Sequence, residues 1–163
     1  MTLLAIDGPA GAGKTTLAAK LESEYSLHST VKVIHMDDLY NGWEDGLGQS
    51  LTDTLEKITS AYRAGKEFTI DLFNWHLMKF DRQEVIAVTD YLILEGVGAA
   101  QEVVRKAGAT TYWLDIDADT GLKRVLARDG AQIEKEMRQW QIKQSTHFAA
   151  DKTRENCEFK LTS

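Results

Sequence analysis

Residues 8–15 read Gly-Pro-Ala-Gly-Ala-Gly-Lys-Thr, and no other stretch restricts the fold of this chain so closely. The segment matches G-x-x-x-x-G-K-[ST] at every defined position, follows the apolar residues 3–6 and precedes residues 14–25, where apolar residues recur at helical spacing. A strand, a glycine-rich turn and a helix in this order form a phosphate-binding loop. Glycine lets successive backbone N–H groups turn inward around an anion, and the helix adds the positive end of its dipole. The alternative interpretation is a glycine-rich turn without a ligand.

The pattern also assigns roles within the loop. Lys14 supplies a mobile positive charge for the β- and γ-phosphates of a nucleotide, and the Thr15 hydroxyl holds Mg²⁺. We therefore expect ATP and Mg²⁺ as cofactors. The residues expected to bind the nucleotide are Gly8, Ala10, Gly11, Ala12, Gly13, Lys14, Thr15 and Thr16.

Length and composition restrict the class of protein. The chain has 163 residues, which suits one domain over residues 1–163, and no apolar run approaches the roughly 18 residues that a membrane helix needs. A net charge of −6 without a block of like charge argues against nucleic-acid binding. The first strand leaves no room for a signal peptide, and the single cysteine, Cys157, cannot form an internal disulfide, so we expect a cytoplasmic protein. The sequence does not indicate an oligomeric state.

Apolar runs alternate with helical patterns along the chain. Strands are expected at residues 1–7, 31–36, 67–73, 90–96, 110–115 and 157–161. Helices are expected at residues 14–25, from a cap at Ser50 to Gly65, at 101–106, from a cap at Asp117 or Asp119 to about 128, and at about 132–149. This order predicts an α/β protein with the three-layer fold of the P-loop NTPase type: a parallel sheet of about five strands with helices on both faces.

Two pairs of charged residues suit phosphoryl transfer, a reaction that needs a base for the acceptor and cations for the transferred phosphate. Asp37 and Asp38 follow a strand, and strand ends gather ligands in parallel sheets, so one of the pair can take the proton of an acceptor hydroxyl. Arg124 and Arg128 share one helix face, where like charges repel unless an anion lies between them. The alternatives are an aspartate that caps a turn and a solvated helix face.

Three segments resemble the uridine kinase family of P-loop nucleoside kinases. Asp37-Asp38-Leu39-Tyr40 is similar to the family's Asp-x-Phe-Tyr, Leu94-Glu95-Gly96 to its strand-ending Glu-Gly, and Arg124-x-x-x-Arg128-Asp129 to its lid arginines. The resemblance implies that Asp37 is the catalytic base, that Glu95 lies with Thr15 in the magnesium region, and that Arg124 and Arg128 close over the ATP phosphates. Together with Lys14, these residues form the expected catalytic set.

The expected acceptor contacts are Asp38, Tyr40, Asn74 and Trp75. The resemblance places Phe73-Asn74-Trp75 where the family has an aromatic-Asp-aromatic segment that contacts the nucleoside, so the family's carboxylate is replaced here by an uncharged amide. The basic loop that often follows the lid helix is also missing. His35 and His76 have no Cys or His partners at metal spacing and are expected to be structural, as is Asp7.

The sequence therefore predicts an ATP-dependent kinase that phosphorylates a hydroxyl of a nucleoside or a related small metabolite, without nucleic-acid or membrane partners. Residues 6–11 resemble the corresponding segment of cytidylate kinases, so a nucleoside monophosphate stays open as an alternative acceptor. Two further classes stay open, a P-loop NTPase that acts as a switch or motor and a nucleotide-binding module without chemistry. Trp43, Trp75 and Trp140 either stack on a base or pack in the core.

Overall fold

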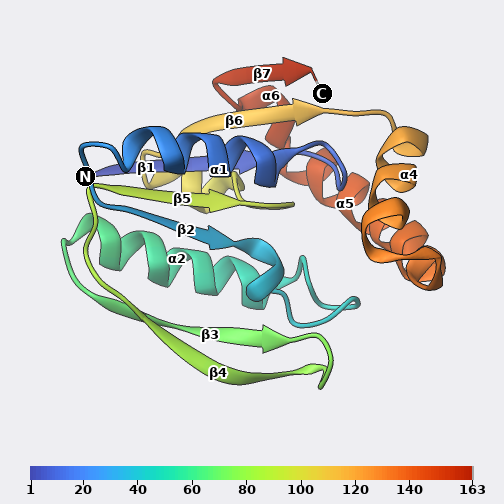
Figure 1. Ribbon diagram of the computed structural model, residues 1–163, viewed down its shortest axis with the longest axis horizontal. Coiled ribbons are helices and arrows are strands. Elements are labelled where there is room, and N and C mark those ends of the chain that lie inside the picture. Colours follow the sequence, from blue (N-terminus) through green and yellow to red (C-terminus); the bar gives the residue numbers. More distant parts are fainter. Residues whose placement is uncertain (163) are drawn as a thin grey trace.

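A central sheet of five parallel strands organises the computed structural model, which describes residues 1–162. The strand order is β2-β5-β1-β6-β7 (Figure 1). The bounds are Thr2–Asp7 for β1, Val31–His35 for β2, Tyr91–Glu95 for β5, Thr110–Asp115 for β6 and Phe159–Thr162 for β7. Every pairing in this sheet is parallel, as expected for strands separated by helices.

Side chains alternate across the sheet, so both faces of its central strands are buried. Leu4 and Ile6 of β1 pack with helix α1 (Lys14–Tyr25) on one face. Leu3 and Ala5 point to the opposite face. The helices with residues in the core of that opposite face are α2 (Gln49–Arg63), α3 (Glu102–Lys106), α4 (Ala118–Asp129) and α5 (Glu134–Asp151). The predicted three-layer α/β fold is thus confirmed.

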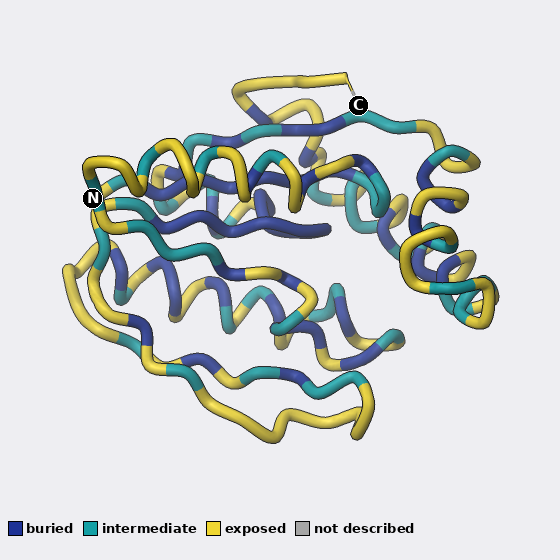
Figure 2. Tube along the Cα trace, in the orientation of Figure 1, coloured by how far each residue is buried: buried dark blue, intermediate teal, exposed yellow. Residues whose placement is uncertain are grey.

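A two-stranded antiparallel hairpin lies outside the central sheet. Strand β3 (Phe68–Asn74) was expected from its alternation, whereas its partner β4 (Lys79–Ile86) was missed. Most of β4 is exposed (Figure 2), and its charged sequence lacks the apolar face that marks a strand. Pairing with β3 across a short turn, together with an ion pair from Lys32 of β2 to Glu84, holds β4 in place.

Three predicted boundaries were shifted. Helix α2 starts at Gln49 after an extended Gly48, so Ser50 lies in its first turn and is not the cap. Helix α5 starts at Glu134 because residues 131–133 form the separate short turn η2 (Ala131–Ile133). Cys157 is buried but precedes β7, and a four-residue helix α6 (Thr153–Asn156) leads up to it.

The carboxyl ends of β1, β5 and β2 meet at one edge of the sheet. Strand register pairs Glu95 of β5 with Ile6 of β1 on one side and with His35 of β2 on the other. The glycine-rich loop follows β1, and the short turn η1 (Met36–Asp38) follows β2. Helices α4 and α5 lie beyond this edge (Figure 1), so segments far apart in the sequence converge there.

Candidate active site

The glycine-rich loop lies close against neighbouring backbone. A Cβ atom on Gly8 would come within 2.3 Å of the Leu114 carbonyl oxygen, and one on Gly11 within 2.5 Å of the Gly121 carbonyl oxygen. Gly13 is different, because its φ of 92° requires glycine while nothing lies within 4 Å of its missing Cβ. The loop is therefore braced on its protein side and open on the side where an anion would sit at the start of α1.

Two buried polar side chains fix this loop to the rest of the fold. The Asp7 carboxylate accepts hydrogen bonds from the backbone N–H groups of Gly8, Gly98 and Ala100 at 2.7, 3.0 and 2.8 Å. Burial raises the pKa of Asp7, while these donors act in the opposite direction. The side-chain oxygen of Gln144 on α5 accepts from the Ala10 N–H at 3.1 Å. Asp7 is structural, as predicted, and Gln144 is an anchor that sequence reasoning did not find.

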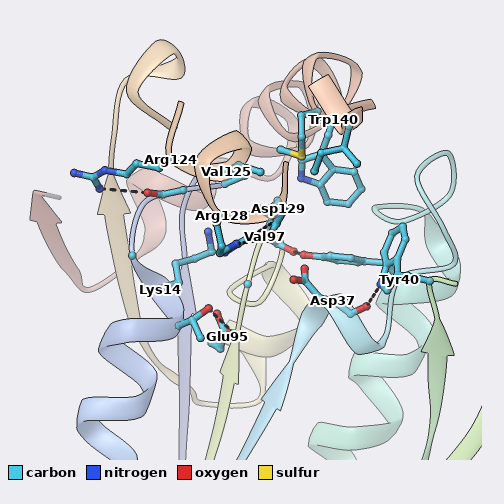
Figure 3. A pocket seen from close by; sticks show the side chains of 18 of the residues that line it. Lys14, Asp37, Tyr40, Glu95, Val97, Arg124, Val125, Arg128, Asp129 and Trp140 are labelled. Carbon is cyan, nitrogen blue, oxygen red and sulfur yellow. Dashed lines mark hydrogen bonds and ion pairs between the residues drawn. The ribbon is translucent and has the colours of Figure 1, made fainter. Parts of the chain in front are cut away.

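A cavity of about 480 Å³ lies beside the loop at the carboxyl edge of the sheet. Figure 3 shows Lys14, Arg128 and Glu95 toward one side of it, Tyr40 and Trp140 toward the other, and Asp37 between them. The expected site residues that line it are Ala10, Gly11, Gly13, Lys14, Thr15, Thr16, Asp37, Tyr40, Trp75, Glu95, Arg124 and Arg128. Gly8, Ala12, Asp38 and Asn74 do not line it; Gly8 and Ala12 support the loop from behind.

The side of the cavity next to the loop is charged. Lys14 Nζ donates to the Pro9 carbonyl oxygen at 2.8 Å, and burial lowers the pKa of this ammonium group while Asp7 and Glu95 partly offset the effect. The Thr15 hydroxyl donates to Glu95 Oε1 at 3.1 Å. Glu95 is buried, so its carboxylate depends on these neighbours for compensation.

His35 is a further member of this cluster. Its Nδ1 contacts Glu95 Oε1 at 2.5 Å, and this hydrogen bond raises the pKa of the imidazole. His35 therefore has a defined structural role: its ring holds the Glu95 carboxylate that faces Thr15. In the sequence, the only sign of this role is that His35 lies at the end of a predicted strand. The tertiary structure decides that β2 lies beside β5.

Thr15 and Glu95 offer the oxygen ligands that Mg²⁺ prefers. This cation usually takes one or two protein ligands and completes its shell with phosphate oxygens and water. No group of three or more His, Cys, Asp or Glu side chains within residues 1–162 is arranged to hold a metal ion. A hydroxyl and a buried carboxylate in contact at the start of α1 nevertheless fit an ion that bridges to a nucleotide.

Asp37 lies where the charged and aromatic parts of the cavity meet. The residue is exposed to solvent through the open cavity, but its place within that cavity removes part of the water around its carboxyl. This partial loss of water raises the pKa of Asp37, as does the nearby Glu95, whereas Lys14 and Arg128 lower it. Trp75 Nε1 donates to the Asp37 carbonyl oxygen at 2.8 Å and fixes its backbone.

The two expected lid arginines occupy different positions. Arg128 forms paired hydrogen bonds with Asp129, from Nε to Oδ1 at 2.7 Å and from Nη2 to Oδ2 at 2.6 Å, and it points into the cavity (Figure 3). Arg124 Nη1 donates to the Gly11 carbonyl oxygen at 3.3 Å and lies against the outside of the loop. Helix α4 therefore brings both guanidinium groups to the end of the cavity that the glycine-rich loop forms.

Aromatic side chains form the other part of the cavity. Tyr40 is buried and donates its hydroxyl to the Val97 carbonyl oxygen at 2.7 Å. Ring centroids are 5.1 Å apart for Trp43 and Trp75, 6.0 Å for Trp43 and Trp140, and 4.9 Å for Tyr40 and Trp140. Trp43, Trp75 and Trp140, which the sequence left between stacking on a base and core packing, pack on each other and on Tyr40 and also line the cavity.

Asn74, expected at the acceptor, is turned away from the cavity. Its Nδ2 donates to Asp81 Oδ2 at 2.7 Å, and its Oδ1 accepts from the backbone N–H groups of His76 and Leu77, each at 3.0 Å. These bonds shape the turn between β3 and β4, so Asn74 is a turn residue in this structure. Asp38 also lies outside the cavity lining, which leaves Asp37 as the aspartate of the pair that faces the site.

The fold and the loop define a protein with the architecture of P-loop kinases. A possible uridine kinase from Bacillus stearothermophilus is 18% identical, with a TM-score of 0.67 over 98% of this chain and 88% of that one. A Silicibacter sp. TM1040 protein named as a fructose transport system kinase is 16% identical, with a TM-score of 0.70 over 99% of this chain and 89% of that one. Shikimate kinase from Bacteroides thetaiotaomicron is 15% identical, with a TM-score of 0.55 over 99% and 85%.

These structures confirm the resemblance to uridine kinase-like P-loop kinases at the level of the fold. A scan of protein-family models gave no match, and a search of curated proteins gave none either. Among the described residues, no helix is both long and apolar enough to span a membrane.

Proposed function

We propose that this protein is an ATP-dependent kinase that transfers the γ-phosphate of ATP to a hydroxyl of a small metabolite, the class that includes the nucleosides expected from the sequence. One observation carries the proposal: Lys14, Thr15, Glu95, Arg128 and Asp37 line a single cavity, with Asp37 between its charged end and its aromatic part. A base placed there can face an acceptor hydroxyl while the loop holds the donor phosphates.

The reaction forms a bond between the acceptor oxygen and the γ-phosphorus, breaks the bond from that phosphorus to the β,γ-bridging oxygen, and releases ADP. Asp37 accepts the hydroxyl proton, and its raised pKa suits a general base better than that of an ordinary aspartate. Lys14 and Arg128 stabilise the negative charge on the phosphoryl group during its transfer. When bound beside Thr15 and Glu95, Mg²⁺ supplies charge neutralisation between the β- and γ-phosphates.

The test is acceptor-dependent release of ADP. Purified protein with Mg-ATP is screened against nucleosides, nucleoside monophosphates, sugars and vitamin precursors, with Asp37→Asn as the matched control. A kinase releases ADP slowly alone and much faster with its acceptor, and the variant loses that increase. Steady ATP hydrolysis that no acceptor changes, equal in Asp37→Asn, would instead favour an NTPase that acts through a partner.

A further inference from the structure

The part of the cavity that would receive the acceptor is almost wholly apolar. The residues that line it, apart from Asp37, are Tyr40, Trp43, Trp75, Gly96, Val97, Val125, Ile133, Met137 and Trp140. None of these described residues carries an amide or a charge, and the Tyr40 hydroxyl is already bonded to the Val97 carbonyl oxygen. The Trp75 N–H is likewise bonded to the Asp37 carbonyl oxygen. Asp129 also lines the cavity, but its carboxylate is paired with Arg128. An acceptor here meets mainly ring surfaces and aliphatic side chains, together with the Asp37 carboxylate and the indole N–H groups of Trp43 and Trp140.

The aromatic residues form a preformed wall. Trp43 meets Trp75 at an interplanar angle of 61° and Trp140 at 79°, so each ring is supported by the edge or face of the next. Trp75 is held in addition by Phe73, with centroids 5.0 Å apart. Tryptophan has only two side-chain torsions, and rings fixed in this way lose little freedom when a ligand binds. Such a wall favours a flat ring, which can contact it over its whole face.

The charges in the cavity disfavour an anionic acceptor. Its cations, Lys14, Arg124 and Arg128, belong to the phosphate loop and to α4, and all three contact oxygen atoms at that end. A carboxylate or phosphate on the acceptor would lie in the aromatic part beside Asp37, and burying it there without a cation is costly.

The apolar lining also differs from what a nucleoside or a sugar requires. A site selects polar groups of its ligand by pairing them, and polar groups left unpaired on binding cost affinity. The side-chain amide of Asn74 is already hydrogen-bonded within the hairpin turn, and Asp38 lies outside the cavity lining. Ribose hydroxyls and the polar edge of a base would therefore lose water and find few partners there, namely the Asp37 carboxylate and the indole N–H groups of Trp43 and Trp140.

From these observations, and resting on the kinase function above, we propose that the acceptor is an uncharged alcohol whose hydroxyl is attached close to a flat, largely apolar ring. The ring lies on the wall formed by Trp43, Trp75 and Trp140, and the hydroxyl faces Asp37. Its oxygen forms the bond to the γ-phosphorus as ADP leaves, and its proton passes to the Asp37 carboxylate. Sugars, nucleosides and phosphorylated metabolites are poor acceptors.

A matched series of probes tests ring, flatness and charge separately. The probes are 4-methylbenzyl alcohol, the anion 4-(hydroxymethyl)benzoate, the saturated (4-methylcyclohexyl)methanol, uridine, cytidine monophosphate and fructose. Titration calorimetry on protein loaded with Mg-ADP gives affinity, and ADP release from Mg-ATP gives kcat/KM. We expect the neutral aromatic alcohol to exceed each of the others by roughly tenfold or more in both measurements, as expected for a site that leaves polar groups unpaired.

Variants of the wall provide the second measurement. Trp75→Leu keeps an apolar side chain but removes the ring together with its hydrogen bond to the Asp37 carbonyl oxygen, whereas Trp75→Phe removes that bond and keeps a ring. Trp75→Leu should weaken 4-methylbenzyl alcohol roughly tenfold, since stacking on one aromatic ring is typically worth about that factor. Its Mg-ATP affinity should be unchanged, and Trp75→Phe should restore part of the loss. The wild-type probe series needs no variant, so a poorly folded Trp75→Leu leaves the test intact.

The outcomes separate the two proposals. If uridine, cytidine monophosphate or fructose binds best and drives ADP release, or if the benzoate matches the neutral alcohol, the acceptor class is wrong and the kinase function stands. If no probe stimulates ADP release and Mg-ATP fails to bind in a Lys14-dependent way, the kinase function fails. The binding series then decides by itself whether the cavity takes a flat, neutral ring.

Discussion

The hydroxyl of Thr15 donates a hydrogen bond of 3.1 Å to Glu95 Oε1, which joins the first turn of α1 to the end of β5 across 80 positions of sequence. Glu95 is buried and also contacts His35, so its carboxylate cannot turn away into solvent. A divalent cation entering here with a nucleotide would replace the hydroxyl proton as the partner of this oxygen.

Replacing Glu95 by Gln should therefore raise the Mg²⁺ concentration needed for half-maximal ATP binding by at least roughly tenfold, the usual cost of disturbing a metal site. Gln keeps the hydrogen-bonding shape but removes the charge. Titrations of Mg²⁺ at fixed ATP measure the effect, and Glu84→Gln on the exposed hairpin is the control, since Glu84 lies outside the cavity. An unchanged Mg²⁺ requirement in Glu95→Gln would place the cation elsewhere.

Lys14→Ala should weaken Mg-ATP binding by roughly 10-fold to 100-fold, the worth of a charge-assisted hydrogen bond. The fold should survive, because burial lowers the pKa of Lys14 and its ammonium group is costly to keep charged without a ligand. Titration calorimetry gives the affinity and thermal unfolding the stability. Equal affinity in the variant and the wild type would contradict the assignment of the loop.

Asp37→Asn should lower turnover by about 10² to 10⁴, the usual contribution of a general base, with little change in Mg-ATP affinity. Asn is close to isosteric with Asp but cannot take the proton. Asp38→Asn is the matched control, because its neighbouring carboxylate lies outside the cavity lining. Steady-state kinetics in which Asp38→Asn lost more than Asp37→Asn would show that the resemblance is out of register by one residue.

The rate should depend on pH through Asp37. Its pKa is raised by loss of water and by Glu95, and the base works only when ionised, so activity is lost on acidification at a pH above the ordinary aspartate value of about 3.9. The same shift means that the ionised carboxyl destabilises the folded state above its raised pKa and has no such effect below about pH 3.9, where both states are protonated.

Asp37→Asn should therefore unfold at a higher temperature than the wild type at pH 7, and the difference should shrink as the pH falls toward 4. Calorimetric scans at both pH values check this expectation. A variant less stable than the wild type at pH 7 would contradict this expectation, because it would mean that the ionised Asp37 carboxyl stabilises the folded state.

Arg128→Ala should reduce turnover more than it weakens ATP binding, since the guanidinium points into the cavity and meets the phosphates most strongly as charge develops. Removing one such donor typically costs about 10² to 10³ in kcat. Arg124→Ala is the comparison, because Arg124 lies against the Gly11 carbonyl oxygen and its loss should also disturb the loop. A double variant with wild-type turnover would remove both residues from the reaction.

Local patterns in the sequence were enough for the position of the glycine-rich loop, for the five strands of the parallel sheet and for most of the charged residues that line the cavity. The places of Lys14 and Thr15 at the cavity could be predicted because they depend on neighbours within a few residues. Asp37 and Glu95 were readable because parallel strands end at a common edge. For Lys14 and Thr15 the relevant geometry is set by backbone conformation over a short stretch of chain, and for Asp37 and Glu95 by the common direction of parallel strands.

Long-range packing decided the remainder. Strand β4 exists because β3 pairs with it, and that turn takes the amide of Asn74 away from the acceptor. His35 reaches Glu95 because β2 lies beside β5, and Gln144 reaches the Ala10 N–H from α5 across 134 positions. No local pattern encodes these contacts, because each depends on which surfaces are buried together when the whole chain folds. The aromatic wall has the same origin: tryptophans at positions 43, 75 and 140 come together only in the tertiary structure.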